Sequence, residues 1–121
     1  MIKTVLTVDD SKTMREMVAF TLSQAGYKVL EAEDGLAGIK VLAGNVVDAI
    51  ITDLNMPNLD GIGFIRQVRG NSKHRFTPIL MLSTEGDAAK KQEGKSAGAT
   101  GWLVKPFSPD KLVEVIKKVC P

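Results

Sequence analysis

The sequence predicts an α/β fold, in which helices cover both faces of a parallel sheet, and two observations carry this prediction. Five short apolar segments alternate along the chain with five longer segments in which apolar residues recur at helical spacing. Four of the short segments end in polar or charged residues, as strands do at the edge where open parallel sheets bind ligands. The 121 residues are enough for one hydrophobic core, and we expect one domain over residues 1–121.

The short segments have the composition of strands. Residues 49–51 form an apolar run just before Asp53, which is typical of a strand that is buried on both faces. Residues 28–32 alternate poorly between apolar and polar side chains, which suits a strand at the edge of a sheet. The predicted strands cover residues 5–8, 28–32, 47–53, 79–82 and 102–104.

The segments between these strands carry helix signals. Asp10 or Ser11 can cap the first helix, and Ser108 followed by Pro109 is a strong start for the last one. We expect the helix over residues 87–97 to be the loosest, because Gly94 in its interior costs about 1 kcal/mol relative to alanine. Five strands alternating with five helices imply right-handed crossovers, and the doubly wound, flavodoxin-like order 2-1-3-4-5 fits a chain of this length.

Composition excludes several classes of protein. The formal net charge of +2 is too small to argue for nucleic-acid binding, and no apolar run approaches the length of a membrane span. Cys120 is the only cysteine, so no internal disulfide can form, and with no signal peptide expected the chain is assigned to the cytoplasm. His74 lies in a polar loop with no second histidine nearby, and it is predicted to be a surface residue.

Chemically useful side chains occur at the ends of four predicted strands. They belong to Asp9, Asp10, Asp53, Ser83, Thr84 and Lys105. Because the carboxyl ends of parallel strands lie at one edge of the sheet, three carboxylates and a lysine should converge there. The carboxylates would repel one another, and Mg²⁺, which takes oxygen ligands, is the natural cation to relieve that repulsion.

The same group of residues suits phosphoryl chemistry. Asp53 is a candidate nucleophile, since carboxylates form aspartyl-phosphate intermediates, and Lys105 and Ser83 would bind phosphate oxygens. Each residue also has an ordinary interpretation: the acidic pair could only cap a helix, Lys105 could be solvated, and Ser83 could be a turn residue. Their occurrence at successive strand ends is a far more specific signal than any one of them.

Four motifs make the sequence resemble the receiver domains of bacterial two-component response regulators. The resemblance covers residues 5–119 and is closest to stand-alone chemotaxis receivers of the CheY type, which lack an effector domain. The motifs are Val8-Asp9-Asp10-Ser11, the run of residues 53–61, Leu82-Ser83-Thr84 and Lys105-Pro106-Phe107.

The resemblance implies a role for each acidic residue. It implies that Asp53 accepts a phosphoryl group from a sensor histidine kinase of the chemotaxis type. It also implies that Mg²⁺ is held by Asp10, Asp53 and the backbone carbonyl of Asn55, while Asp9 acts mostly through water. Catalysis would then be limited to phosphorylation and dephosphorylation of Asp53 itself, so the protein is not expected to be an enzyme in the ordinary sense.

The resemblance further implies that Lys105 and Ser83 bind the phosphoryl oxygens, and that the Lys105–Pro106 bond is cis. Trp102 stands where chemotaxis receivers usually have tyrosine, and we expect it to switch together with Ser83; the alternative is a fixed packing residue on an edge strand. The residues expected to flank the phosphoryl group and tune its transfer and hydrolysis are Thr84, Asn55 and Glu85.

The resemblance also implies partners. The output face would be formed by the last strand and the last two helices, and we expect it to bind an output protein such as the flagellar motor switch. A phosphatase is a further expected partner, and the receiver itself is expected to be a monomer. Five lysines on this face could instead be a merely solvated surface. They are Lys90, Lys91, Lys95, Lys111 and Lys118.

Three other functions compete with the switch. A phosphorelay intermediate would use the same site to pass the phosphoryl group to a histidine phosphotransfer protein. An aspartate-nucleophile phosphohydrolase needs a second acid two residues after the nucleophile, but Asn55 occupies that position. A flavin-binding module needs a phosphate-binding loop after the first strand, where Asp9 and Asp10 would repel phosphate.

Overall fold

A single parallel sheet forms the centre of the molecule. The computed structural model describes residues 2–84 and 88–121. The five strands have the order β2-β1-β3-β4-β5, which confirms the predicted flavodoxin-like topology. Their bounds are β1 Thr4–Val8, β2 Lys28–Ala32, β3 Ala49–Asp53, β4 Ile79–Ser83 and β5 Gly101–Val104.

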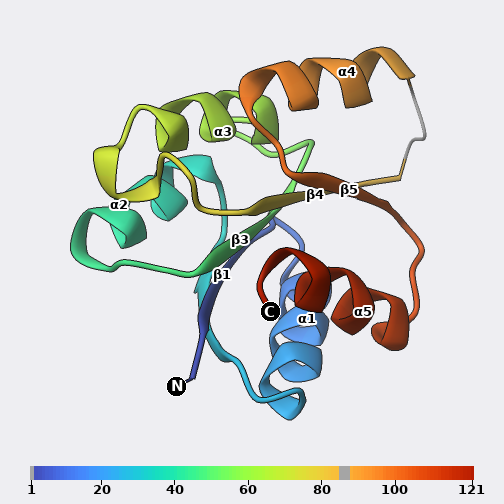
Figure 1. Ribbon diagram of the computed structural model, residues 1–121. Helices are drawn as coiled ribbons and strands as arrows, with labels where there is room; N and C mark the ends of the chain where they lie inside the picture. Colours follow the sequence, from blue (N-terminus) through green and yellow to red (C-terminus); the bar gives the residue numbers. More distant parts are fainter. Residues whose placement is uncertain (1, 85–87) are drawn as a thin grey trace.

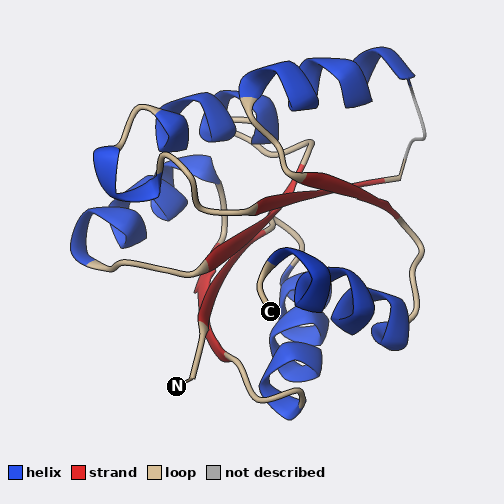
Figure 2. Cartoon of the chain, viewed as in Figure 1, coloured by secondary structure: helices blue, strands red, loops and turns tan. Residues whose placement is uncertain are grey.

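Helices cover both faces of this sheet. The helices are α1 Lys12–Gln24, α2 Gly35–Gly44, α3 Gly61–Arg69, α4 Ala88–Ala97 and α5 Pro109–Val119, with a short 3₁₀ turn, η1, at Ser72–His74. α1 and α5 lie on one face, and α2, α3 and α4 lie on the other (Figure 1). The sheet is therefore the middle layer of three, as Figure 2 shows. None of the described helices is long and apolar enough to cross a bilayer.

Two hydrophobic clusters, one on each face, fill the space between the sheet and the helices. Alternate residues of each strand enter opposite clusters, so that Ile50 packs with Phe64 of α3 and Ile51 packs with Leu22 of α1. All five residues of β3 and all five of β4 are buried. This burial on both faces explains why the central strands are nearly continuous apolar runs in the sequence.

Capping side chains determine where several helices begin. Ser11 caps α1, because its Oγ accepts a hydrogen bond of 3.2 Å from the Met14 N–H. Asp34 and Asp60 do the same for α2 and α3, and Ser108 does so for α5. Of the two capping residues proposed for α1, Ser11 thus fills the role.

Gly94 has a packing role in α4 that helix propensity alone does not reveal. It is buried, and a Cβ at this position would lie 3.1 Å from Cζ3 of Trp102 and 3.3 Å from Sδ of Met81. The glycine therefore lets α4 approach the indole of Trp102 closely. The helix itself spans Ala88–Ala97, within the predicted limits.

The prediction that His74 lies on the surface is wrong. The η1 turn folds the loop between α3 and β4 back over the start of β3, which leaves His74 completely buried. Its Nε2 accepts a hydrogen bond of 3.3 Å from the N–H of Val47. Because Val47 donates to the histidine, β3 begins at Ala49 and not at the predicted position 47.

Arg69 ties the same region together. Its guanidinium donates hydrogen bonds of 2.7–3.1 Å to backbone carbonyls. The acceptors are the carbonyl groups of His74, Arg75, Thr77 and Gly98. Since Gly98 follows α4, one side chain joins α3, the loop before β4 and the end of α4.

Candidate functional site

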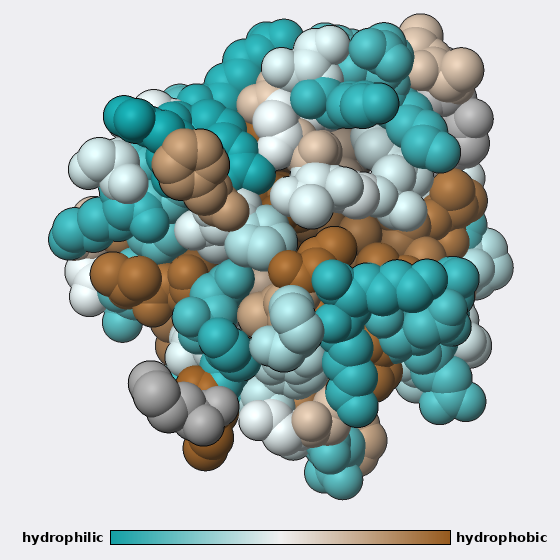
Figure 3. Space-filling model, viewed as in Figure 1, coloured by the Kyte–Doolittle hydropathy of each residue, from teal (hydrophilic) through white to brown (hydrophobic). Residues whose placement is uncertain are grey.

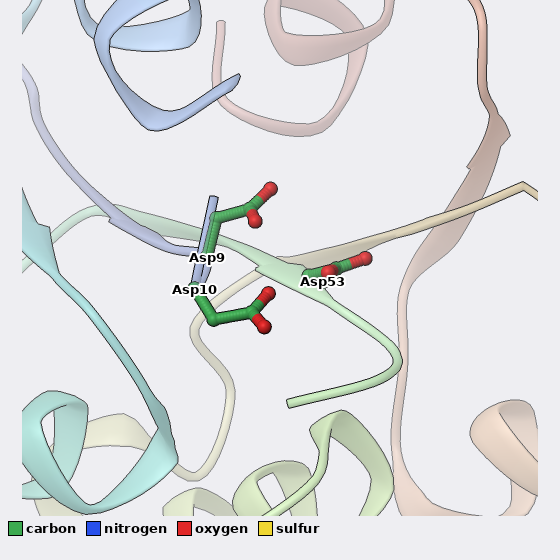
Figure 4. A group of neighbouring side chains, drawn as sticks. All are labelled: Asp9, Asp10 and Asp53. Carbon is green, nitrogen blue, oxygen red and sulfur yellow. The ribbon is translucent and has the colours of Figure 1, made fainter. Parts of the chain in front are cut away.

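The three acidic residues predicted for the site do come together. Asp9 and Asp10 follow directly from β1, and Asp53 ends the neighbouring strand β3, whose Thr52 pairs with Val8. One carboxylate oxygen from each of the three lies within 4.8 Å of the others. Figure 4 shows the three carboxyl groups projecting to the same side of the strand ends.

Asp9 is the most constrained of the three carboxylates. It is only 2% exposed, its Oδ1 accepts a hydrogen bond of 2.9 Å from the N–H of Ser11, and its Oδ2 is buried without a hydrogen bond among the described residues. Burial raises the pKa of Asp9 above its usual value, and the charges of Asp53 and Asp10 raise it further. The Ser11 N–H and Lys105 act in the opposite direction without cancelling the effect. Asp10, by contrast, is exposed to solvent.

Lys105 contacts two of the three carboxylates, those of Asp53 and Asp9. Its Nζ donates a hydrogen bond of 3.0 Å to Oδ1 of Asp53 and lies 3.5 Å from Oδ2 of Asp9. The lysine reaches this position because its own N–H donates to the carbonyl of Ser83 at 2.6 Å, immediately after the paired part of β5. The Lys105–Pro106 bond is cis, as expected.

The loop that follows Asp53 is closely attached to the site. The Leu54 N–H donates 3.0 Å hydrogen bonds to Oδ1 of Asp53 and to the carbonyl of Leu82. Gly61 starts α3 directly against β3, where a Cβ would collide with the carbonyl oxygen of Asp53. Asn55 lies in this loop and is exposed.

The remaining predicted site residues lie at different depths. Ser83 is buried at the end of β4, next to Lys105, whereas Thr84 is exposed. Trp102 does not face the carboxylates: it pairs with Met81 and packs against Gly94, and its Nε1 is buried without a hydrogen bond among the described residues. Glu85 lies outside the residues that the structure describes.

Arg15 is a supporting residue to which the sequence analysis gave no role. Its Nη1 donates a hydrogen bond of 2.8 Å to the carbonyl of Asp9, and its Nε lies 3.3 Å from Oε1 of Glu31. It therefore links α1, the end of β1 and β2 behind the acidic group. The available signal was its position one turn after the Ser11 cap, on the side of α1 that faces the strand ends.

The acidic group fits a magnesium ion. Its donors are carboxylate oxygens, which Mg²⁺ prefers, and the single charge of Lys105 faces three carboxylates. The pKa of Asp9 is raised, and its buried Oδ2 accepts no hydrogen bond among the described residues and has only the ion pair with Lys105, as expected for carboxylates that are crowded together. A divalent ion would relieve both, with the exposed Asp10 leaving room for bound water.

Comparison with known proteins gives a consistent result. The model of the response regulator receiver domain matches residues 5–117. The chemotaxis protein CheY1 of Helicobacter pylori (strain ATCC 700392 / 26695) is 41% identical over 116 residues, covering 94% of each chain. The chemotaxis response regulator CheY4 of Vibrio cholerae is 49% identical, with a TM-score of 0.95 over 98% of this chain and 99% of that one.

A more distant structure bears on the metal. The receiver domain of the sensor histidine kinase PA1611 from Pseudomonas aeruginosa PAO1 is 25% identical, with a TM-score of 0.91 over 99% of this chain and 98% of that one. In that structure a magnesium ion is coordinated in the active site cleft.

Proposed function

Because the chain belongs to the response regulator receiver family and is a phosphorylation-activated signalling switch of the chemotaxis CheY type, we propose that Asp53 is its phosphoacceptor. One observation carries this assignment: Asp53 is the carboxylate that accepts a hydrogen bond from Lys105 and lies within the acidic group formed with Asp9 and Asp10. It ends the central strand, at the edge where open parallel sheets bind their ligands, and it is 8% exposed there.

The proposed transfer forms one bond and breaks one. A carboxylate oxygen of Asp53 attacks phosphorus while the bond from phosphorus to the donor, a histidine nitrogen of the kinase, breaks. Asp10, Asp53 and the carbonyl of Asn55 would hold Mg²⁺, with Asp9 acting mostly through water, and the ion would supply positive charge for the phosphoryl oxygens. Lys105, which now donates to Asp53, would transfer that hydrogen bond to a phosphoryl oxygen, and the Ser83 hydroxyl would donate to another.

Three residues are proposed to set how long the phosphoryl group persists. Thr84 is exposed beside Ser83, so its β-branched side chain would narrow the approach of small donors and of water. Asn55 is exposed two residues after Asp53 and would flank the phosphoryl group from the other side. Glu85 is assigned the same kind of role from the family resemblance. Beyond phosphorylation and dephosphorylation of Asp53, we propose no enzymatic activity.

The proposed switch connects Ser83 to Trp102. Lys105 and Ser83 are joined by a backbone hydrogen bond, so movement of the Ser83 hydroxyl toward the phosphoryl group would alter the junction of β4 and β5. Trp102 lies on β5, and its Nε1 has no hydrogen bond to a described residue that would have to break when the indole moves. The resulting change would reach α4, β5 and α5, whose lysine-rich surface suits an acidic or amphipathic segment of an output protein.

CheY-type receivers interact with histidine kinases and output targets. For this chain we propose a chemotaxis kinase as donor, the flagellar motor switch as output and a phosphatase as a further partner. The phosphorelay alternative has less support, since the similar proteins described above include chemotaxis proteins.

The test is to incubate the protein with Mg²⁺ and acetyl phosphate and to record intact mass and tryptophan fluorescence. Wild type should gain one phosphoryl group, and the fluorescence of Trp102, the only tryptophan, should change with it. Asp53→Asn should gain none, whereas Asp60→Asn, a matched change at the cap of α3, should behave as wild type. Equal phosphorylation of Asp53→Asn would refute the phosphoacceptor, and unchanged fluorescence in phosphorylated wild type would refute the switching role of Trp102.

A further inference from the structure

Exposed apolar residues gather at the edge of the sheet that lies opposite Asp53. Six large apolar side chains are strongly exposed among the described residues, and three of them belong to the loops at the amino ends of the strands. These three are Ile2, Val46 and Phe76, which are 73%, 65% and 90% exposed. Single exposed apolar residues are ordinary, but half of the total on one edge marks a surface.

Hydrogen bonds place these loops next to one another. The Asp48 N–H donates to the carbonyl of Thr4 at 2.7 Å, which brings the segment of Val46 beside that of Ile2. The Val47 N–H donates to Nε2 of His74, two residues before Phe76. The three apolar side chains thus come from adjoining segments of one edge.

The same edge is basic. Four exposed cationic side chains accompany the apolar ones: Lys3, Lys28, Lys73 and Arg75. None of the four takes part in an ion pair among the described residues. The nearby acid, Asp48, uses its Oδ2 to accept a hydrogen bond of 2.7 Å from the Thr4 N–H. We call this region the basal surface; it consists of Ile2, Lys3, Lys28, Val46, Lys73, Arg75 and Phe76.

The segment that carries Phe76 is firmly anchored. Arg69 donates to the carbonyls of His74, Arg75 and Thr77, so the backbone on both sides of Phe76 is tied to α3. The exposed phenyl ring is therefore presented by a fixed backbone. Such preorganisation lowers the conformational entropy that binding must cost.

A recess adjoins these loops. It has a volume of about 180 Å³ and is lined by Ile39 and Leu42 of α2, by Gln67 and Val68 of α3, and by Gly70 and Asn71, which follow α3. The loops with Val46 and Phe76 begin directly after these helix ends. The recess is large enough for one aliphatic side chain of a partner.

We propose that the basal surface is a second docking site, which binds an acidic protein segment carrying an apolar side chain. The basic side chains of the surface would attract an acidic segment. The exposed apolar residues and the recess would contact an apolar side chain of that segment. In Figure 3 hydrophobic brown atoms lie among hydrophilic teal ones on the left of the molecule and around its amino-terminal end. A nucleic acid would gain little from Ile2 and Val46, and a bilayer would not need a recess.

This proposal goes beyond the switch function and does not depend on it, because the basal surface lies at the strand ends opposite Asp53. To find the partner chemistry, short random peptides displayed on phage are panned on wild type and counter-selected on the Lys73→Glu/Arg75→Glu/Phe76→Ser triple variant. Enriched peptides should combine Asp or Glu with at least one large apolar residue. Failure to enrich such peptides would overturn the proposal.

A synthetic enriched peptide then gives the quantitative test. Its Kd should weaken by roughly ten-fold or more with Lys73→Glu/Arg75→Glu and with Phe76→Ser. It should not change with Lys12→Glu/Lys117→Glu, the same charge reversal on α1 and α5, nor with Asp53→Asn. Equal weakening by the control pair would overturn the proposal. A second result would also overturn it: wild type binds phosphatidylglycerol vesicles or single-stranded DNA, and the variants of the basal surface do not. The ligand of this surface would then be a lipid or a nucleic acid.

Discussion

The two edges of one sheet treat their polar groups in opposite ways. At the carboxyl ends of the strands, three carboxylates lie close together, Lys105 pairs with two of them, and the pKa of Asp9 is raised. At the amino ends, the guanidinium of Arg69 donates to backbone carbonyls of two separate segments, the loop before β4 and the end of α4. One edge carries electrostatic repulsion that a ligand can relieve, and the other holds the loops together.

The two edges therefore contribute to the stability of the fold in different ways. Every residue of β3 and β4 is buried, and close packing keeps the centre of the sheet rigid between its two edges. Repulsion at the site is tolerated because the opposite edge and both cores supply the stability. Substitutions at the two edges should therefore change the stability of the fold in opposite directions.

Arg69→Ala should have the largest effect. It removes a charged donor from carbonyl groups that are partly buried, and we expect a loss of about 2–4 kcal/mol in the free energy of unfolding. Urea unfolding of the variant beside Arg66→Ala, an exposed arginine of the same helix, measures it. If Arg69→Ala lowers the free energy of unfolding no more than Arg66→Ala does, Arg69 does not anchor the loops at this edge.

Asp9→Asn should have the opposite sign. A carboxyl whose pKa is raised in the fold contributes stability only below its ordinary value of 3.8, and that stability is lost as pH rises through the raised value. Removing the charge should therefore stabilise the metal-free protein near neutral pH by about 1 kcal/mol. The variant should also lose most of the stabilisation that added Mg²⁺ gives wild type.

Asp34→Asn is the matched control for Asp9→Asn, and thermal unfolding with and without Mg²⁺ is the measurement. Asp34 lies at the same edge, but hydrogen bonds from the Ala37 N–H and from Asn58 lower its pKa. Its substitution should not stabilise the protein and should leave the response to Mg²⁺ intact. If Asp9→Asn were destabilising without metal, the idea of repulsion at the site would be wrong.

His74→Gln should have the smallest effect on the free energy of unfolding, and only at acidic pH. Burial lowers its pKa below the usual 6.5, with a smaller contribution from Lys73. The neutral ring thus contributes stability that is complete above the unfolded pKa and is lost as pH falls through the lowered one. Between about pH 7 and pH 5, wild type should lose up to about 1 kcal/mol more than His74→Gln. Urea unfolding at both pH values measures this, and parallel losses would contradict it.

Sequence reasoning reached the strand order and the acidic group because both follow from local patterns. Asp53 could be assigned because a buried apolar run ends beside it and strand ends of a parallel sheet meet at one edge. His74, Arg69 and Gly94 could not be assigned in this way. The burial of His74 depends on the η1 turn, and the importance of Gly94 depends on an indole eight residues further along the chain.

The candidate site likewise contains residues that local patterns predict and one that they do not. The residues that touch the acidic group could be predicted from their position after strands, but Arg15 could not, because its role depends on where α1 crosses the end of β1. The start of β3 was placed too early for a related reason: Val47 is apolar enough for a strand, yet its N–H is taken by His74.

The strand order has a consequence for how the chain assembles as it is synthesised. β1 and β3 are neighbours in the sheet, and the first 53 residues already contain Asp9, Asp10 and Asp53. Lys105 follows β5 and leaves the ribosome much later. Until then the carboxylates lack that lysine, whose contacts with Asp9 and Asp53 can form only after β5 has been synthesised.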